Sequence, residues 1–386
     1  MLESKKTFLS TIIVASLICI HTFTAAINMN NSFIIFVALL YLASAYAGTF
    51  KLSRTYFSII LILIACSIGS YLLGVETALL SAEYCILIGL FLSFNEYNLD
   101  YERLFKILIS VGYSIVPLLY IRAKSLSYGI GTYDMDSGAM MGMTYAILPL
   151  LLMSISSLFV NLGRLWKCAA ILIVLVLLFI LSLIGSRGFF VAFASYFMLV
   201  GIVLINQTKR RRIQALIISV ILLFVLSQYS LQILNGITSI CESIGLEIYA
   251  LIKMNSYLAM DNLDNGRLEI WNNCVKGFLD SPFGHSIGSF EELYDVHQHN
   301  ILLQTMWEFG IIGIVFLVFY IYRSIKILID DKFPKPLFLV FASIFCSSIV
   351  LLFYSSSFWV LPNFWLWTKI VINYNNLKFN ETSVTL

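Results

Sequence analysis

The sequence predicts an all-α membrane protein, a polytopic bundle of about twelve transmembrane helices. Of its 386 residues, 60% are hydrophobic and only 12% are charged, and the mean hydropathy is +0.91. Water-soluble globular chains are close to half apolar and one quarter charged. Apolar runs of about 18 residues or more, long enough to cross a hydrocarbon core of about 30 Å, recur along the chain. Because uninterrupted runs of this length do not fit a membrane barrel, we expect a helical bundle.

The spans can be placed in order along a single membrane domain, 1–386. The first has no small-residue cleavage site before the next apolar run, so we interpret it as a retained span and not as a signal peptide. The twelve candidates are 7–27, 32–50, 55–74, 77–94, 104–121, 138–160, 166–185, 187–205, 213–234, 301–322, 336–353 and 355–373.

The distribution of Lys and Arg predicts the orientation. If the N-terminus is cytoplasmic, 18 of the 24 basic residues fall on the cytoplasmic side, as the positive-inside rule requires. Both termini are then expected inside. The run KRRR at 209–212 is explained as a topology anchor, so no nucleic acid partner is needed. The six external basic residues are Arg122, Lys124, Arg187, Lys253, Arg267 and Lys276.

Two external loops are long, 122–137 and 235–300, and the second separates spans nine and ten. Its segments 244–260 and 267–279 are apolar enough to form short helices on the membrane surface or on the bundle. The latter carries apolar residues at helical spacing and ends at the breaker Asp280-Ser281-Pro282. These apolar residues are Leu268, Trp271, Val275, Phe278 and Leu279.

Cysteines and histidines give little sign of a metal. There is no CxxC and no zinc-type spacing, and five of the seven cysteines fall inside apolar runs as small core residues. Cys241 and Cys274 share the long loop, where a disulfide is the less favoured alternative to free thiols. His285, His297 and His299 would need a reshaped helix start to meet at one ion, so we expect no metal.

Charges kept outside by a charge-poor chain are the candidates for chemistry. Arg187 stands at a membrane edge, where an arginine usually has a partner, although a snorkelling side chain is the simpler alternative. Arg267 opens the surface helix, where its charge opposes the helix dipole and an anionic partner is favoured over a plain surface arginine. His297 and His299 precede the tenth span and are either solvated or act near neutral pH as a base or orienting group. Glu308 follows within a few turns as a lower-ranked site residue.

Four stretches carry a resemblance to a known family. They are YGIGTYDMDSGAMMG at 128–142, SRGFF at 186–190, GRLEIWNNCVKGFLDSPFG at 266–284 and HNILLQTMWEFGIIG at 299–313. The last has a His-Asn pair, nine residues, then Gly-x-x-Gly. In order, spacing and side of the membrane the set resembles the O-antigen polymerase and ligase superfamily, over roughly the C-terminal two thirds of the chain.

The resemblance implies a GT-C-like helical fold in the bacterial inner membrane and a metal-independent, inverting glycosyl transfer without a cofactor. The donor would be an oligosaccharide on undecaprenyl pyrophosphate at the periplasmic face. By motif, Arg187 and Arg267 would hold the pyrophosphate, for which arginine is the preferred partner. His299 would act on the acceptor hydroxyl.

The same resemblance implies supporting roles for other residues. Asn300, Gly310 and Gly313 would shape the entry of the helix, and His297 occupies a position where some relatives have a second histidine. His297, Asn300, Glu308 and Arg122 are the candidate substrate-binding residues. Expected partners are membrane lipid and, beyond the donor, a chain-length regulator and a flippase.

Three functions remain open at this stage. A polymerase joins lipid-linked repeat units, and a ligase transfers the finished polymer to lipid A-core. The stretch from Gly284 to His299 is short and lacks the longer basic insert typical of similar ligases, which favours the polymerase. A flippase is less favoured, because we see no internal repeat and little midplane charge.

Overall fold

The computed structural model describes residues 2–27, 32–95, 100–128, 137–184, 187–205, 239, 243, 267–330 and 333–374. Within these ranges the chain is helical, and its only strand-like pairing is one antiparallel bridge between Phe50 and Asn95. The predicted all-helical fold is thus confirmed.

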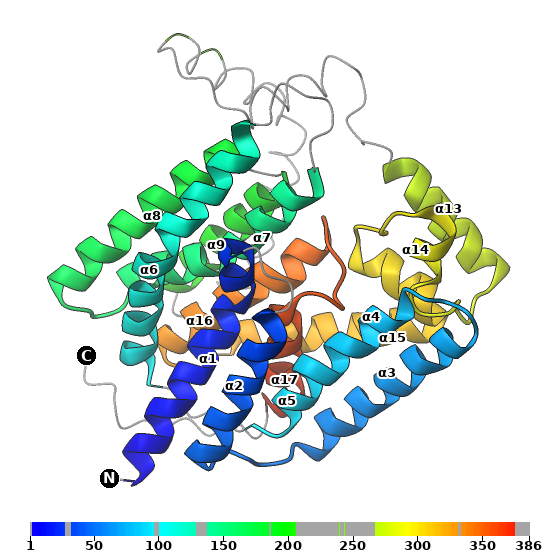
Figure 1. Cartoon of the computed structure of the whole chain (residues 1–386), viewed down its shortest axis with the longest axis horizontal. Helices are drawn as coiled ribbons and strands as arrows, with labels where there is room; N and C mark the ends of the chain where they lie inside the picture. Colours follow the sequence, from blue (N-terminus) through cyan, green and yellow to red (C-terminus); the bar gives the residue numbers. More distant parts are fainter. Residues whose placement is uncertain are drawn as a thin grey trace.

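The helices follow the predicted spans along the chain (Figure 1). They are α1 (Leu2–Ile27), α2 (Ser32–Ala47), α3 (Arg54–Leu72), α4 (Ala78–Tyr84) continued by a π-helical turn (Cys85–Leu90) and α5 (Phe91–Ser93), α6 (Tyr101–Tyr128), α7 (Ser137–Leu158), α8 (Arg164–Ile184), α9 (Arg187–Ile205), α13 (Arg267–Asp280), α14 (Ser289–Tyr294), α15 (Ile301–Ile329), α16 (Lys335–Phe345) with a π-helical end (Cys346–Val350), and α17 (Pro362–Asn373).

Six of these helices are long and apolar enough to cross a membrane, and four more apolar helices are shorter. The six are Lys6–Ile27, Arg54–Leu72, Tyr101–Leu126, Ala139–Leu158, Arg164–Leu181 and Ile301–Ile329, and the four are Ile34–Tyr46, Ala78–Ser93, Gly188–Gly201 and Lys335–Val350. Each coincides with one predicted span. The ninth predicted span, 213–234, lies outside the described residues, so the count of twelve is not reached.

The twelfth predicted span, 355–373, is wrong as a continuous helix. Helix α17 begins only at Pro362 and has 12 residues. At about 1.5 Å per residue it is far shorter than a hydrocarbon core of about 30 Å. Residues 353–361 before it are irregular, and several of their side chains are buried. Irregular backbone at membrane depth is tolerated only inside protein, which is where this segment lies.

Helix α7 is the centre of the bundle. In the most apolar stretch of this helix 83% of the residues are buried, whereas only 28% are buried in the corresponding stretches of α3, α8 and α15. It packs against α1, α6, α8, α9 and α16. The Ser156 hydroxyl oxygen lies 2.6 Å from the Tyr196 hydroxyl of α9 and 2.8 Å from the Ser343 hydroxyl of α16. Such hydrogen bonds between helices add to the van der Waals packing that holds membrane bundles together.

One end of the bundle gathers turns that the basic residues assign to the cytoplasm. Phe50 pairs with Asn95, and the Ser53 hydroxyl donates to Asn373 Oδ1 at 2.8 Å. The buried Lys369 ammonium donates to the backbone carbonyl of Asn95. The turns after the second and fourth spans therefore meet the C-terminal helix α17.

The opposite end gathers the loops assigned to the outside. The Thr77 hydroxyl, in the turn before α4, donates to the Gly288 carbonyl at 2.7 Å. Asn300 Nδ2, ahead of α15, donates to the Phe353 carbonyl at 3.0 Å. Over the residues that the structure describes, these contacts agree with loops that alternate between the two ends. Which end faces the cytoplasm still rests on the Lys and Arg distribution.

Helix α15 bends sharply at Gly310, which has φ 60° and ψ −144°. At this bend the turn Pro282–Gly284 lies directly against the helix backbone. The Ile311 amide donates to the Pro282 carbonyl at 2.9 Å, and the His285 amide donates to the Trp307 carbonyl at 2.7 Å. A Cβ at Gly310 would lie 2.3 Å from the Pro282 oxygen. Only glycine satisfies both the left-handed φ and this approach.

A second glycine of the same motif is needed for a similar reason. Because the bend folds the chain back on its preceding turn, a Cβ at Gly313 would lie 2.5 Å from the Thr305 carbonyl oxygen. The implied role of Gly310 and Gly313 in shaping the helix entry agrees with this geometry.

Gly310→Ala should lower the free energy of unfolding by more than about 1 kcal/mol, because it combines backbone strain with a steric clash. Thermal unfolding in detergent would measure the effect. Gly69→Ala in α3 is the control, since a Cβ there meets nothing within 4 Å and alanine favours helix. Equal melting temperatures for the two variants would contradict this account of the bend.

Candidate active site

Helix α13 is the surface helix predicted in the long loop, and it ends at Asp280, as expected. Its inner face, with Ile270, Cys274 and Phe278, packs against the first half of α15. Its outer face keeps four of the five predicted apolar residues exposed, and Phe278 turns inward instead. The exposed residues are Leu268, Trp271, Val275 and Leu279.

Cys274 is a free cysteine that is fully buried under this helix. Burial, followed by the negative charge of Glu291, raises the pKa of the Cys274 thiol to about 12. A thiol in this environment is chemically inert. Cys241, its alternative disulfide partner, lies outside the described residues.

Trp307 is the point to which the loop attaches. The His285 ring stacks on it at 4.0 Å between centroids, and the buried Phe290 ring meets it edge-on at 5.0 Å. Its indole N–H donates to the Ser289 hydroxyl at 2.9 Å. Gly277 of α13 leaves room for the indole, because a Cβ there would lie 2.1 Å from it. One tryptophan thus joins α13, α14 and α15.

His285 is therefore a packing residue. Its Nε2 lies 3.1 Å from the Gly277 carbonyl oxygen, and its ring covers Trp307. This position separates it from His297 and His299, with which a metal site was one alternative. Among the described residues, no group of three His, Cys, Asp or Glu side chains is arranged to hold a metal ion.

His299 has a strained backbone at the entrance of α15. Its φ is +54°, in the left-handed region. Burial, followed by the positive charges of Arg267 and His297, lowers the pKa of its imidazole to about 4. Its Nδ1 is buried and has no hydrogen-bond partner among the described residues. Such strain and unsatisfied polar atoms are concentrated at functional sites.

Arg267 and His299 lie near enough to interact electrostatically. Arg267 opens α13, which packs against α15, and its positive charge contributes to the lowered pKa of the His299 imidazole. The arrangement offers a cationic group and an uncharged imidazole at the same end of the bundle.

His297 lies beside His299, with 6.3 Å between the ring centroids. Its Nδ1 contacts Glu291 Oε1 at 2.8 Å. The hydrogen bond to Glu291, opposed by burial and assisted by the charge of Glu291, raises the pKa of His297. The two neighbouring histidines therefore shift in opposite directions.

Asn300 fixes the start of α15. Its Oδ1 accepts from the Leu302 amide at 2.9 Å and from the Leu303 amide at 3.4 Å, as an N-cap residue does. Its Nδ2 holds the Phe353 carbonyl. The implied role in helix entry agrees with these bonds, and they turn the whole Asn300 side chain toward the protein.

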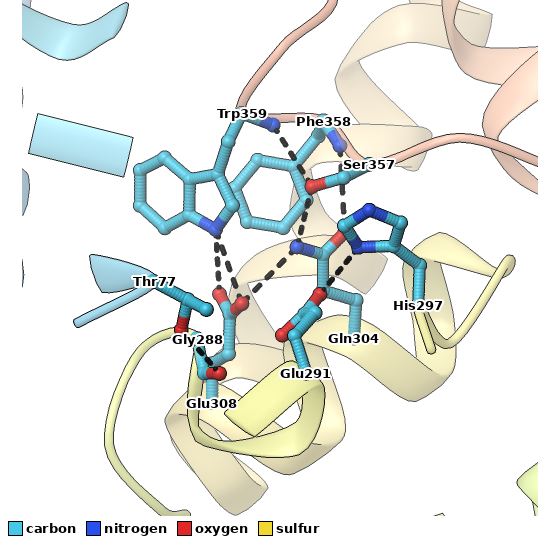
Figure 2. A network of polar contacts seen from close by, with 9 residues as sticks. All are labelled: Thr77, Gly288, Glu291, His297, Gln304, Glu308, Ser357, Phe358 and Trp359. Atoms are coloured by element: carbon cyan, nitrogen blue, oxygen red, sulfur yellow. Dashed lines mark hydrogen bonds and ion pairs between the residues drawn. The ribbon is translucent and has the colours of Figure 1, made fainter. Parts of the chain in front are cut away.

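Glu308 is only 4% exposed and belongs to a polar network within the protein (Figure 2). The Trp359 indole N–H donates to both of its oxygens, at 3.1 and 3.0 Å, and Gln304 Nε2 donates to one of them at 3.1 Å. Gln304 also donates to the Ser357 hydroxyl at 2.8 Å. The carboxylate thus ties α15 to the irregular segment before α17.

Arg187 and Arg122 are located by the helices on which they lie. Arg187 opens α9, and the structure describes only its backbone position. Its neighbour Gly188 lies at the outer end of the bundle, where a Cβ would approach Tyr145 Oη at 3.2 Å and Leu351 at 3.7 Å. Arg122 lies on α6, which packs against α1, α7 and α8. Its predicted part in substrate binding remains a prediction.

Sequence reasoning did not single out Glu291, Gln304 and Trp359. Glu291 was one of many loop acids, and its partner His297 is six residues away, which is no helical spacing. Trp359 fell inside the twelfth predicted span, where an apolar run hides a polar contact. Glu308 itself could have predicted this network, since a buried acid in a membrane span requires hydrogen-bond donors.

Trp359→Phe should lower the free energy of unfolding by about 1–3 kcal/mol, because it removes one of the donors of the buried Glu308 carboxylate. The melting temperature in detergent would report the loss. Trp271→Phe on the exposed face of α13 is the matched control and should stay within about 0.5 kcal/mol of the unchanged protein. A Trp359 variant as stable as the control would show that Glu308 does not depend on the indole.

Comparison with known proteins identifies the segment that builds this site. Residues 172–318 match a family model described as O-antigen ligase. Comparisons with curated proteins and with solved structures gave no match. The matched segment contains α9, α13, α14 and the bent first part of α15. The predicted resemblance is therefore confirmed over residues 172–318, which are similar to the O-antigen ligase family model.

Proposed function

We propose that this protein is an O-antigen polymerase of the bacterial inner membrane, which joins repeat units carried on undecaprenyl pyrophosphate at the periplasmic face. The observation that carries the proposal is that His299, strained at the entrance of α15, interacts electrostatically with Arg267 at the start of α13. Both residues, and Arg187 at the start of α9, lie within the matched family segment.

We assign the two arginines to the leaving group because of the negative charge that it carries. When the anomeric C–O bond breaks, negative charge develops on the pyrophosphate, and guanidinium groups hold phosphate oxygens in a bidentate fork. Removing one such donor from a preorganised site typically costs about 3 kcal/mol of transition-state stabilisation. In this proposal Arg187 and Arg267 supply that stabilisation, and the neutral His299 contacts the acceptor hydroxyl.

Helix α13 is suited to hold Arg267 at the depth of a lipid headgroup. Its exposed apolar residues are Leu268, Trp271, Val275 and Leu279, and α15, against which α13 packs, also exposes Ile311 and Ile312. A helix with one face on protein and another on lipid lies in the membrane interface. The pyrophosphate of a polyprenyl donor lies at the same level.

The ligase is the second candidate, because the matched family model is described as O-antigen ligase. The composition of residues 285–298 supports the polymerase in our proposal. This segment has no Lys or Arg and has three acids, Glu291, Glu292 and Asp295. Such a surface is unsuited to a phosphorylated lipid A-core and accepts a neutral sugar more readily. A flippase is the third candidate, and a chain-length regulator remains an expected partner.

A clean deletion strain should make lipopolysaccharide whose core carries a single repeat unit, with the longer ladder absent on a gel. This pattern is expected of a missing polymerase. Bare core with polymer accumulating on undecaprenyl pyrophosphate would show a ligase instead. An unchanged ladder would remove the protein from this pathway.

Arg267→Ala and His299→Ala should each abolish glycan extension while the protein is still expressed, because each removes a polar group from the reacting site. Complementation of the deletion strain, scored by the gel ladder, measures this. Lys276→Ala, on the exposed side of α13, and Lys124→Ala are controls expected to restore the full ladder. Normal product lengths with either site variant would disprove its assigned role.

A further inference from the structure

Glu291 and His297 form a carboxylate–imidazole pair that the motif does not account for. His297 Nδ1 lies 2.8 Å from Glu291 Oε1. The Glu291 side chain is 13% exposed, whereas that of His297 is 54% exposed. A carboxylate only accepts hydrogen bonds, so the Nδ1 of a neutral His297 carries its proton and its Nε2 has the free lone pair.

The pair is formed by helix α14 and the short, well-packed turn that follows it. Helix α14 is anchored by Phe290, which is fully buried against Trp307. The helix ends in the left-handed residue Asp295, whose amide donates to the Glu291 carbonyl at 2.9 Å. This reversal returns the chain so that His297 lies over the Glu291 carboxylate, as Figure 2 shows.

The surroundings of the pair are polar and incompletely bonded. Glu291 Oε2, Gln298 Nε2 and His299 Nδ1 are buried and have no hydrogen-bond partner among the described residues. Gln298 is only 1% exposed. Three such atoms within nine residues are unusual, because buried polar groups are nearly always bonded. Sugar hydroxyl groups, which both donate and accept, match this mixture of donors and acceptors.

We propose that His297, oriented by Glu291, is the general base of the transfer, and that His299 is an uncharged group that positions the acceptor hydroxyl. This inference rests on the proposed function and deepens it. It makes His297 a catalytic residue and Glu291 a positioning residue.

The step balances as follows. The acceptor hydroxyl oxygen forms a bond to the anomeric carbon of the donor sugar while its proton passes to His297 Nε2. The bond from that carbon to the pyrophosphate oxygen breaks, and its electron pair leaves with the undecaprenyl pyrophosphate. Glu291 stabilises the imidazolium that forms, and the proton is then released to water.

The basicities of the two histidines favour this assignment. A general base works best with a pKa near the working pH. The pKa of His297 is raised by Glu291, whereas that of His299 is lowered to about 4 by burial and by Arg267. His299 therefore stays uncharged near neutral pH but accepts a proton poorly.

The charged or titratable groups that interact with the pair or with the adjacent His299 are Cys274 and Arg267 on α13 and Glu308 on α15. Glu292 on α14 and Asp295 and His299 on the connecting loop are neighbours of the pair in the sequence. Glu291 raises the pKa of His297, whereas burial, then Arg267 and His297, lower the pKa of His299.

The test is the rate of extension against pH, with the full-length protein in liposomes and lipid-linked repeat units extracted from the deletion strain. His297→Gln should lose about 100-fold or more, the usual contribution of a general base. Glu291→Gln should lower the plateau rate and move the acid limb to lower pH, because the charge that raises the pKa of His297 is gone. Glu291→Asp should recover part of both effects.

Asp280→Asn, which neutralises an exposed carboxylate at the end of α13, is the matched control and should behave like the unchanged protein. A His297→Gln rate within a few-fold of the unchanged protein would overturn the proposal. An acid limb that stays in place in Glu291→Gln would overturn it even if His297→Gln failed to fold. Absence of extension by the unchanged protein would instead refute the polymerase function, so the two failures are distinguishable.

Discussion

The turn Pro282–Gly284 and the bend of α15 at Gly310 lie backbone against backbone, and the outer end of the molecule is organised by this contact. The Ile311 amide, which the bend deprives of its helical partner, donates to the Pro282 carbonyl. The approach brings His285 onto Trp307 and thereby fixes α13 and α14 on α15. Without side chains at Gly284 and Gly310 to hold them apart, a loop of the outer face becomes part of the membrane bundle.

This attachment converts a long loop into a rigid support. Arg267 is held at the start of α13, Glu291 at the first turn of α14, and His299 at the strained residue before α15. A site built on packed helices keeps its geometry better than one on mobile loops. The second half of the support comes from Asn300 and Glu308, which bond to the segment 353–361 and so connect the site to α16 and α17.

Most of the fold could be predicted from the sequence, because hydrophobic length and the position of Lys and Arg are properties of the chain alone. Ten helices lie on predicted spans, and α13 ends where Asp280-Ser281-Pro282 ends it. The failure at the twelfth span has a physical cause. An apolar run buried among other helices has the same composition as one that crosses lipid, so only the starting proline at 362 marked the true helix. The contacts of Glu291 with His297 and of Trp359 with Glu308 depend on turns at Asp295 and Gly310. The hydrophobic periodicity of the sequence does not reveal these turns.

Two histidines with nearly the same sequence context illustrate why residue type alone does not assign a catalytic role. His297 and His299 are two residues apart, but His297 faces a carboxylate and His299 is more confined and faces a guanidinium. Their pKa values are pushed in opposite directions, and titratable pairs separated in this way divide acid–base work from binding. Burial is the main cause that keeps His299 uncharged, and the second is the guanidinium of Arg267, which is assigned to the leaving group. The same charge can therefore hold the donor and help burial to prevent a cationic His299 from forming beside the acceptor, which leaves the proton to the imidazole that Glu291 supports.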